Sequence, residues 1–545
     1  MRSLYFGDNL DILREHVRDE SVDLVYLDPP FNSKRDYNLL FKTPKGQSSD
    51  AQITAFEDSW HWGEQAETEY SEILHQSNTE VAGMIEALRR FLGESDMLAY
   101  LTMMANRLIE LHRVLKPTGS LYLHCDPTAS HYLKIVLDSV FGPASFRNEI
   151  VWKRQSAHSD AKTKFPAVSD VVLFYAKTKE AEFHPLYTTH DQSYLDKFYR
   201  HDDEDGRGTY RLGDMASPNP RPNMMYEWMG FASPAKGWRY QRETMQKLHD
   251  EGRIQYPRNR DGTLDATRRP SLKRYLGEQE GSIVTNVWDD IQPLHAAAVE
   301  ALNYPTQKPL ALLERIINAS SNPGDIVLDP FCGCGTAVHA AEKLGRGWIG
   351  IDITHLAVSL IERRMKDAFP GIAFVVHGTP KDHAGARNLA ERDKYQFQFW
   401  ALSLVKAQPY KSGKKGADGG TDGLIYFQDD KGPAKKIVVS VKGGESVTRT
   451  MIADLSNTVK RDKAAIGLFV TLAPPTQPMI TEAASAGFYE SPLHGAFPKI
   501  QILTIEGLLD GREQPRYPDM ARGAHTFRQA KREEEGTEQP KLLGE

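Results

Sequence analysis

Cysteine is scarce in this sequence, with three residues in 545. Three cysteines cannot build a disulfide framework, so the composition predicts a protein of a reducing compartment, and the cytoplasm is the expected location. Long hydrophobic runs are absent too, because no segment approaches the roughly 18 apolar residues that a membrane span needs. The first residues, MRSLYFGDNLDIL, lack the basic and then apolar layout of a signal peptide. We therefore expect no membrane partner.

An excess of positive charge is also missing. The chain has 67 Lys and Arg against 73 Asp and Glu, for a net charge of -6 at pH 7. Any contact with nucleic acid must therefore come from a local basic surface. With 26% charged and 40% hydrophobic residues the composition is typical of a globular protein. The length predicts three to four domains, at about 150 residues per domain.

Strands and helices alternate in the first part of the chain. Apolar residues three and four positions apart predict an amphipathic helix over 96–115, which Pro117 and Gly119 end. The polar stretch from the first strand to Ser77 is expected to form loops. The expected elements are strands at 22–27 and 120–124 and helices at 96–115 and 129–141. This alternation predicts a parallel sheet with helices on its faces.

The alternation breaks between about Asn148 and Tyr304. This segment is irregular and rich in Arg, Tyr, Trp, Pro and Gly, and short strands are expected only at 150–152 and 171–175. Beyond it, helices are expected at 310–320, 336–344 and 356–369, and strands at 326–328 and 348–351. The irregular segment therefore looks like an insertion between two halves of one α/β domain.

The sequence changes character again after Gly378. A helix is expected over 386–405, strands are expected at 424–427 and 437–441, and helices and strands alternate from Met451 to Leu509. This predicts a separate α/β domain. The charged tail that follows is expected to be disordered and solvated.

A glycine-rich turn links the strand at 326–328 to the next helix. Its sequence is Asp329-Pro330-Phe331-Cys332-Gly333-Cys334-Gly335-Thr336. Glycines at such a turn let a ligand approach the backbone, and the helix presents free N–H groups to it. Asp352 ends the following strand 23 residues after Asp329, which suits a carboxylate that binds both hydroxyls of a ribose. The pattern predicts a nucleotide-like cofactor.

A second motif, Asp28-Pro29-Pro30-Phe31, ends the buried strand at 22–27. The double proline stiffens the chain and removes two N–H donors, so the neighbouring carbonyls stay free to accept hydrogen bonds. Together with the Asp28 carboxylate they suit a planar –NH₂ group, and Phe31 offers a flat face on which a base can stack.

These two motifs resemble those of the S-adenosylmethionine-dependent DNA methyltransferases that modify exocyclic amino groups. The first matches the family's D-P-F-x-G-x-G cofactor motif, and the second matches its catalytic D/N/S-P-P-Y/F/W motif. The catalytic motif comes first, with a long variable region between the two, which is the β-class order. Phe6-Gly7-Asp8-Asn9 and Tyr304-Pro305-Thr306-Gln307-Lys308-Pro309 agree, and the resemblance covers residues 1–375.

The resemblance implies a Rossmann-like domain with a mixed, mainly parallel sheet, S-adenosylmethionine as cofactor and double-stranded DNA as partner. Asp329, Phe331, Gly333 and Gly335 would line the methionine end of the cofactor. Asp352 would hold its ribose, Asp8 would contact its adenine ring, and Thr306, Gln307 and Lys308 would close the pocket. The catalytic residues would be Asp28, Pro29, Pro30 and Phe31. The expected domains are a catalytic half at 1–149, a target-recognition domain at 150–303, a cofactor-binding half at 304–380, a second domain at 381–512 and a charged tail at 513–545.

The expected target-recognition domain is neutral overall but contains a local basic cluster. Such a cluster would track phosphates and reach into a groove, although a solvated basic loop is the simpler alternative. Its members are Arg253, Arg258, Arg260, Arg268, Arg269, Lys273 and Arg274.

The chemistry fits the exocyclic amino group of adenine or cytosine as the target. The lone pair of an exocyclic nitrogen is delocalised into the ring, and hydrogen bonds to Asp28 and the Pro29 carbonyl would favour a more tetrahedral nitrogen. The base must leave the stack, and attack on the methyl group is then a direct displacement in which positioning supplies much of the acceleration. The resemblance favours adenine, because the motif begins with Asp and the family's cytosine-amino enzymes more often begin it with Ser; cytosine N4 is the alternative. Cys332 and Cys334 lack partners for a zinc site.

The second domain resembles the restriction-endonuclease-like PD-(D/E)xK superfamily over about 385–510. Asp422 and Lys442 match the nuclease pattern, but Ser440 stands where a second acid or Gln is expected. Carboxylates of such a site hold Mg²⁺ and the lysine activates water, with Asp422 as the candidate metal ligand. The domain is an active nuclease, a DNA-binding remnant or an unrelated α/β domain.

We therefore expect a site-specific DNA adenine methyltransferase of a restriction–modification or phage-related epigenetic system. The alternatives are a cytosine N4 enzyme, a bifunctional methyltransferase–endonuclease, a non-catalytic DNA-binding protein and a methyltransferase of protein glutamine side chains. A homodimer or a restriction partner subunit is compatible with the sequence.

Overall fold

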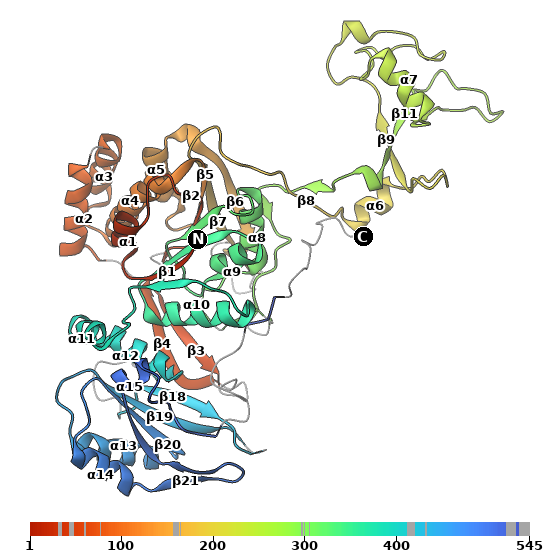
Figure 1. The fold of residues 1–545 in the computed structure, drawn as a ribbon. Coiled ribbons are helices and arrows are strands. Elements are labelled where there is room, and N and C mark those ends of the chain that lie inside the picture. Colours follow the sequence, from red (N-terminus) through yellow and green to blue (C-terminus); the bar gives the residue numbers. More distant parts are fainter. Residues whose placement is uncertain are drawn as a thin grey trace. The chain divides into compact units, whose positions relative to one another are not determined.

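A computed structural model describes most of the chain, and its residues fall into two compact units, 1–184 with 286–534 and 185–285. Figure 1 shows the helices and strands of both units. The described residues are 1–30, 35–42, 48–58, 61–76, 78–155, 163, 165–295, 298, 300–302, 304, 306–410, 420–430, 433–518 and 530–533, of which 35–42 and 48–58 are described by their backbone only.

The first unit is built on a nine-stranded sheet with the order β13-β6-β7-β5-β2-β14-β15-β1-β16. Only the pairs that β7 makes with β5 and β6 are antiparallel, so the sheet is mixed and mainly parallel, as predicted. The strands are β1 (Arg2–Phe6), β2 (Val22–Leu27), β5 (Leu115–Cys125), β6 (Phe146–Lys153), β7 (Ser169–Ala176), β13 (Val287–Trp288), β14 (Ile326–Asp329), β15 (Gly347–Asp352) and β16 (Val375–His377).

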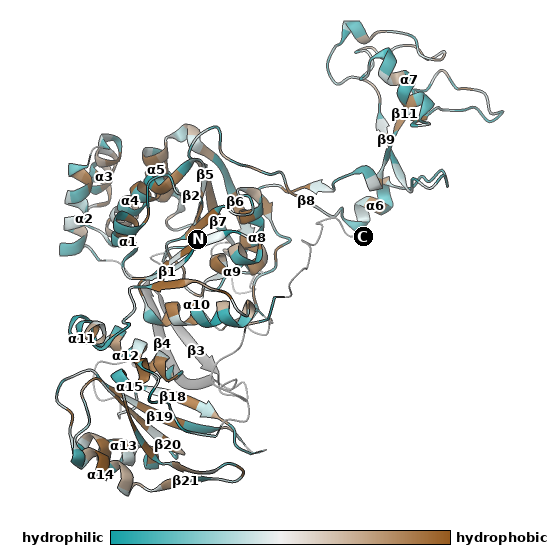
Figure 2. Ribbon diagram, viewed as in Figure 1, coloured by the Kyte–Doolittle hydropathy of each residue, from teal (hydrophilic) through white to brown (hydrophobic). Residues whose placement is uncertain are grey.

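Helices cover both faces of this sheet (Figure 1). On one face, α1 (Asn9–His16), α3 (Thr79–Leu92), α4 (Asp96–Val114) and α5 (Ser130–Phe141) share one hydrophobic core with the strands. On the other, α9 (Thr336–Lys343) packs on β14 and β15, beside α8 (Leu310–Ala319) and α10 (His355–Ala368). Figure 2 shows the hydrophobic colour gathered on the strands of this sheet. The predicted helix over 96–115 and strand over 120–124 are confirmed as α4 and β5.

The expectation of loops up to Ser77 is wrong. The structure has a hairpin of β3 (Arg35–Lys42) and β4 (Ser48–Asp58), and then α2 (Glu64–His75). The apolar face of α2 consists of only Ala66, Tyr70 and Ile73, which are buried at spacings of three and four among polar residues. Packing of this narrow face against α4 explains a helix that the polar composition concealed.

The second unit is a small, separately packed body. Its core contains Met215, Trp228, Phe231 and Trp238, and partly buried tyrosines surround it. Its elements are β8 (Tyr187–Thr188), α6 (Gln192–Phe198), β9 (Tyr210–Asp214), α7 (Arg242–Asp250), β10 (Ile254–Gln255), β11 (Ser271–Tyr275) and β12 (Ser282–Ile283). The unit is shorter than the predicted insertion 150–303, because β6 and β7 are strands of the nine-stranded sheet.

The C-terminal part of the first unit has its own five-stranded sheet, in the order β17-β18-β19-β20-β23. The single helix predicted over 386–405 is two helices, because Asp393 ends the first and caps the second by accepting the N–H groups of Tyr395 and Gln396. The elements are α11 (His383–Arg392), α12 (Lys394–Leu404), β17 (Gln408–Pro409), β18 (Gly423–Phe427), β19 (Lys435–Lys442), α13 (Arg449–Arg461), β20 (Ile466–Thr471), α14 (Gln477–Ser485), β21 (Phe488–Ser491), β22 (Gly495–Pro498), β23 (Ile500–Thr504) and α15 (Ile505–Leu509).

The charged tail is not wholly solvated. Glu533 is hydrogen-bonded to the buried His339 ring at 3.0 Å, and its N–H donates to the carbonyl of Ala368 at 2.9 Å. For residues 530–533 the expectation of a free tail is therefore wrong. None of the helices in the described ranges is long and apolar enough to cross a membrane.

Candidate active site

Three aspartates that are far apart in the sequence end neighbouring strands. β2, β14 and β15 are adjacent and parallel, so Asp28 follows the end of β2 at the same sheet edge where Asp329 and Asp352 end β14 and β15. The carboxyl ends of parallel strands are where α/β sheets bind ligands. The fold thus brings together the two motifs that the sequence singled out.

The cofactor loop, residues 329–336, depends on its glycines. Gly333 and Gly335 have φ values of 52° and 74°, in the left-handed region that other residues avoid. A Cβ atom on Gly335 would also lie 2.8 Å from the Ile361 side chain. Gly335 is the N-cap of α9, so the first N–H groups of that helix face the loop.

A buried arginine supports the cofactor loop from α10. Arg364 donates to the Cys334 carbonyl at 2.9 Å, to the Thr336 hydroxyl at 3.2 Å and to His339 Nδ1 at 3.1 Å. Burial lowers the pKa of His339 to about 4, so its ring is neutral at physiological pH and can accept this hydrogen bond. The sequence pattern does not reveal Arg364, because a charged residue in an amphipathic helix usually faces solvent.

The Asp352 carboxylate accepts hydrogen bonds from the neighbouring loops. Its Oδ1 accepts the N–H and the hydroxyl of Thr354, both at 2.9 Å, and its Oδ2 accepts the Gly333 N–H at 2.9 Å. Burial raises the pKa of Asp352 to about 6, although these donors oppose the rise. An ionised carboxylate has about four lone-pair positions and three are used here, so capacity remains for a hydroxyl donor.

The neighbouring Asp329 lies in surroundings that disfavour its negative charge. Burial raises its pKa well above the usual range, the Phe331 N–H opposes that rise, and the charges of Asp28 and Asp352 add to it. Phe331 packs against the hydrophobic core. A cationic ligand would relieve the repulsion between these carboxyl groups, and S-adenosylmethionine, with its sulfonium and ammonium groups, fits them.

The two oxygens of Asp28 have different surroundings. Oδ2 pairs with the Lys308 ammonium, 280 residues further along the chain. Oδ1 is buried and has no hydrogen-bond partner among the described residues. An unsatisfied buried acceptor costs about 1–3 kcal/mol, so this atom is poised for a donor that comes from a ligand.

The structure describes two of the other three residues of the catalytic motif. Pro29 is buried and Pro30 is half-buried directly after β2, whereas Phe31 lies outside the described residues.

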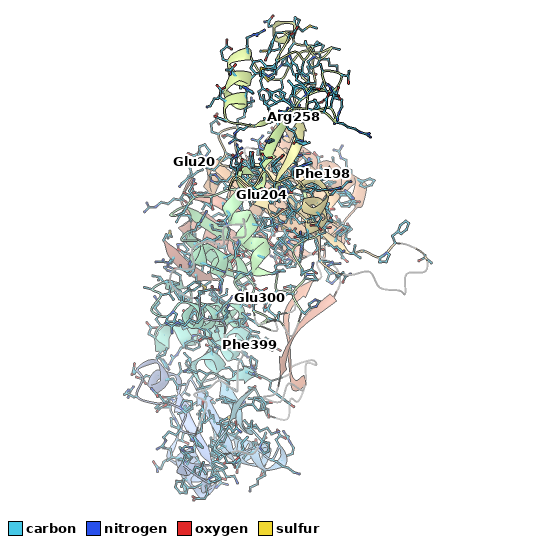
Figure 3. The ribbon with its side chains drawn as sticks, turned by 90° about the vertical axis from the view of Figure 1, so that its right-hand side faces the viewer. Glu20, Phe198, Glu204, Arg258, Glu300 and Phe399 are labelled. Carbon is cyan, nitrogen blue, oxygen red and sulfur yellow. The ribbon has the colours of Figure 1, made fainter. Side chains whose placement is uncertain are left out.

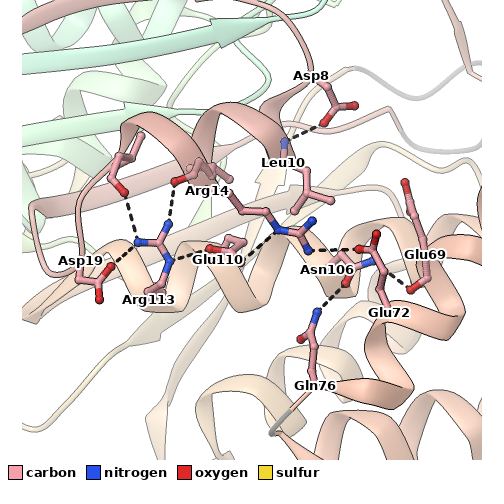
Figure 4. A network of polar contacts seen from close by, with 12 residues as sticks. Asp8, Leu10, Arg14, Asp19, Glu69, Glu72, Gln76, Asn106, Glu110 and Arg113 are labelled. Atoms are coloured by element: carbon pink, nitrogen blue, oxygen red, sulfur yellow. Dashed lines mark hydrogen bonds and ion pairs between the residues drawn. The ribbon is translucent and has the colours of Figure 1, made fainter.

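Asp8 is the N-cap of α1. Its Oδ1 accepts the Leu10 N–H at 2.7 Å, as Figure 4 shows, and its carboxylate pairs with the buried Arg107 at 3.1 Å. The next residue, Asn9, donates to the Pro330 carbonyl at 2.9 Å. The start of α1 is therefore tied to the cofactor loop, and Arg107 is a second buried arginine that the sequence pattern does not reveal.

Thr306, Gln307 and Lys308, which precede α8, make different contacts. Gln307 spans its own loop, since its side chain donates to the Glu300 carbonyl and accepts the Leu302 N–H, each at 2.7 Å. Lys308 makes the ion pair with Asp28 described above, and Thr306 is half-buried beside them. Tyr304 is buried against Gly333.

The predicted basic cluster of the second unit divides into two groups. Arg253 pairs with Glu278 and Glu251 at 2.5 and 2.9 Å, and Lys273 pairs with Asp203 at 2.5 Å. These two cations are neutralised within the unit. Exposed basic side chains of the cluster are those of Arg258, which Figure 3 labels, Arg260, Arg268 and Arg269, whereas Arg274 is half-buried.

The predicted nuclease residues lie together at the junction of β18 and β19. The Asp422 carboxylate accepts the Ser440 hydroxyl at 3.3 Å, and the Lys442 ammonium is 4.0 Å away. The part of the chain that the structure describes contains no group of three or more His, Cys, Asp or Glu that could hold a metal ion. The Mg²⁺ prediction therefore gains no support.

Comparisons with known proteins agree with this geometry. The family model described as DNA methylase, for N6 and N4 amino-methyltransferases, matches residues 22–363. A second model, described as NACHT-associated inactive Restriction Endonuclease 1, matches residues 397–510.

Relatives of the chain are bacterial methyltransferases. The type II methyltransferase M.EcaI of Enterobacter cloacae is 29% identical over 365 residues, 66% of this chain and 69% of that protein. The Mod subunit of the type III restriction-modification enzyme StyLTI of Salmonella typhimurium is 26% identical over 62% of this chain and 49% of that protein. The DNA adenine methyltransferase YhdJ of Escherichia coli is 24% identical over 67% of this chain and 82% of that protein.

Proposed function

Because this chain belongs to the DNA methylase family, we propose that it is a site-specific DNA methyltransferase that transfers a methyl group from S-adenosylmethionine to the N6 amino group of adenine in duplex DNA. The observation that carries the proposal is the state of Asp28. One oxygen is fixed by Lys308 and the other is buried without a partner among the described residues. That arrangement suits a base whose amino group donates one hydrogen bond.

The catalytic role of Asp28 follows from the electronic structure of the base. The amino nitrogen of adenine is a poor nucleophile because its lone pair is delocalised into the ring. A hydrogen bond from the –NH₂ group to Asp28 Oδ1, and one to the Pro29 carbonyl, would favour a more tetrahedral nitrogen with a localised lone pair. Lys308 would hold the carboxylate in place, and we propose Phe31 as the surface on which the base stacks. Reaching this site requires the base to leave the helix stack.

The cofactor site would lie along the edge formed by β14, β15 and the start of α1. We propose that Asp352 binds the ribose hydroxyls, that Asp8 contacts the adenine ring, and that the cofactor loop faces the methionine end. When bound, S-adenosylmethionine supplies an electrophilic methyl group. The proposed cofactor residues are Asp8, Thr306, Gln307, Lys308, Asp329, Phe331, Gly333, Gly335 and Asp352.

Two arguments support adenine as the target base. The motif begins with Asp, and one relative is named as a DNA adenine methyltransferase. The matched family covers both N6 and N4 enzymes, so cytosine N4 is the competing target.

We propose that residues 185–285 recognise the target sequence, through the exposed basic side chains of the cluster. Two relatives are named as Mod subunits of type III restriction-modification enzymes, which supports a restriction partner subunit. A cytoplasmic location, in contact with chromosomal DNA, belongs to the same proposal. DNA cleavage does not, because the model matched by the C-terminal domain is described as inactive.

Two measurements test the proposal. Purified protein incubated with tritium-labelled S-adenosylmethionine and mixed-sequence duplex DNA should label the DNA. Methylation-aware sequencing of DNA from cells that express the chain should find N6-methyladenine in one sequence motif. Label on cytosine would favour the N4 alternative, label on protein would favour a glutamine substrate, and an absence of label would overturn the proposal.

A further inference from the structure

Helix α12 contacts both the methyltransferase domain and the five-stranded sheet β17-β18-β19-β20-β23, the nuclease-like sheet. On the methyltransferase side, the Gln396 side chain accepts the His355 N–H at 3.0 Å. One turn further on, Phe399, labelled in Figure 3, packs against Tyr304 and Cys334 of the cofactor region. Helix α12 is therefore part of the wall behind the cofactor loop.

The hydrogen bond from His355 lies close to the proposed ribose ligand. His355 is the first residue of α10 and is buried, with its ring stacked on Phe6 at 3.5 Å. The residue before it, Thr354, donates two hydrogen bonds to Asp352. Any movement of α12 would thus be felt at the turn that orients the Asp352 carboxylate.

On its other side, α12 is fixed to the nuclease-like sheet by Asp422. Gln398 donates to Asp422 Oδ1 at 3.1 Å, and Oδ2 accepts the Val441 N–H at 2.7 Å and the Ser440 hydroxyl at 3.3 Å. A Cβ atom on Gly443 would lie 2.8 Å from the Phe397 ring, so helix and sheet also pack closely here. Both carboxylate oxygens already accept hydrogen bonds within the protein.

We propose that Asp422, Gln398 and Gln396 are positioning residues of the cofactor site, in which the former nuclease aspartate anchors α12 and α12 holds the turn that carries Asp352. This inference rests on the proposed function, because it assigns a support to the proposed cofactor site. It also explains how Ser440 is compatible with this fold. In the anchor Ser440 is a hydrogen-bond donor to Asp422, a role that a second carboxylate could not fill.

Binding of S-adenosylmethionine to the full-length chain, measured by calorimetry, tests the proposal together with the Michaelis constant for the cofactor. Gln396→Met keeps the side-chain length but removes the acceptor for His355, and should weaken cofactor binding about threefold to tenfold, the range that one hydrogen bond gives. Gln396→Glu restores an acceptor at the N-terminus of α10 and should rescue binding. The turnover number at saturating cofactor should stay unchanged in both variants.

Substitutions at Asp422 distinguish its proposed role as an anchor of α12 from a role as a metal ligand. Asp422→Ala removes all three accepted hydrogen bonds and should weaken cofactor binding at least as much as Gln396→Met. Asp422→Asn can still accept the Val441 N–H and, after rotation of the Gln398 amide, bond to that side chain, so binding should stay near the wild-type value. Tyr395→Ala is the matched control, since this side chain on the same helix is 57% exposed.

The possible outcomes are distinct. Wild-type affinity in both Gln396→Met and Asp422→Ala would overturn the inference and leave the proposed function intact. A wild-type chain that binds no S-adenosylmethionine would overturn the proposed function and the inference with it. Mg²⁺-dependent DNA cleavage that Asp422→Asn abolishes would show a metal site and overturn the anchor. If Asp422→Ala does not fold, Gln396→Met and its rescue by Gln396→Glu decide the matter.

Discussion

At the scale of single residues, the two oxygens of the Asp28 carboxylate have different roles. Lys308 fixes Oδ2, while Oδ1 stays buried without a partner among the described residues. The energy lost by leaving this acceptor unsatisfied is recovered when a donor arrives, which favours the amino group of a base over an apolar ligand.

The first prediction concerns Asp28→Ala. This variant should lose methyl transfer to DNA while S-adenosylmethionine affinity stays within a few-fold of wild type, because Asp28 is proposed to touch the base and not the cofactor. Calorimetry and tritium transfer on the same preparations separate the two effects. A loss of cofactor binding would mean that the two parts of the site are assigned wrongly.

The second prediction concerns Asp352, whose pKa is raised to about 6 by burial. Only the ionised carboxylate keeps its remaining acceptor position for the ribose, so cofactor affinity should fall as the pH drops through about 6, by up to about tenfold per unit. Burial lowers the pKa of His339 to about 4 and that of His355 to about 3, so neither ring titrates in this range.

Calorimetry at pH 7.5, 6.0 and 5.0 measures this dependence. Asp352→Asn is the control, since it should bind at least tenfold more weakly at pH 7.5, by the loss of a charged hydrogen bond of about 1.5–3 kcal/mol, and should show a flat profile. Equal slopes in wild type and variant would contradict the ribose role.

At the scale of elements, the start of α9 depends on glycine for two separate reasons, and the third prediction separates them. Gly335→Ala combines left-handed strain of about 1–2 kcal/mol with a clash against Ile361. Gly345, at the end of the same helix, has a φ of 72° but open space around its Cβ position, so Gly345→Ala adds strain alone.

Urea denaturation and cofactor titration compare the two variants. We expect Gly335→Ala to be the less stable and to bind S-adenosylmethionine at least tenfold more weakly, while Gly345→Ala keeps its affinity. Equal losses in both would show that close packing around the cofactor loop contributes nothing beyond the strain.

The fourth prediction concerns the second unit. Arg268 and Arg269 are exposed, and replacing both with Ala should lower DNA affinity and flatten its salt dependence, because each phosphate contact contributes about -0.9 to the log–log slope. Arg253 pairs with two glutamates and lies over the Tyr275 ring, so Arg253→Ala should destabilise the unit and leave the slope unchanged.

Filter binding between 50 and 300 mM salt measures both slopes. A wild-type slope in the Arg268→Ala, Arg269→Ala variant would identify the cluster as a solvated loop.

The elements that the sequence revealed are those with a strong local pattern. Strand β2, the cofactor loop and helix α4 each combine an apolar run with a turn or stop signal. Helix α2 was missed because its apolar face is narrow. Phe31, which is predicted to stack on the target base, lies outside the described residues.

The contacts that the sequence did not reveal connect distant segments. The Lys308–Asp28 pair and the Arg364 support of the cofactor loop join residues 280 and 30 positions apart. The Gln398–Asp422 hydrogen bond joins residues 24 positions apart, but across a helix and a sheet whose packing no local pattern encodes. Charge and polarity identify the candidates for such contacts, and only the fold decides the partners.

At the scale of the whole molecule, the buried carboxyls make stability depend on pH, which gives the fifth prediction. The folded pKa of Asp352 is raised, so its stabilising contribution is full below about pH 4 and is lost as the pH rises through about 6. The cofactor-free protein should therefore lose about 1–3 kcal/mol over this range, and bound S-adenosylmethionine should offset the loss.

Thermal unfolding at pH 5.0 and 7.5, with and without S-adenosylmethionine, tests this expectation. The rise in Tm on adding cofactor should be larger at pH 7.5. A larger rise at pH 5.0 would contradict the proposed pairing of a cationic cofactor with these carboxylates.

The position of β1 in the sheet affects how the protein is made. This first strand pairs with β15 and β16, so residues 2–6 gain their first strand partner after residue 352 and their second only after the ribosome has passed residue 377. At about 5–20 residues per second, synthesis of that length takes roughly 20–75 s. During this interval the nascent chain carries unpaired strand edges that another copy can capture. The yield of folded protein should therefore depend on the rate of translation and on the chaperones that shield these edges.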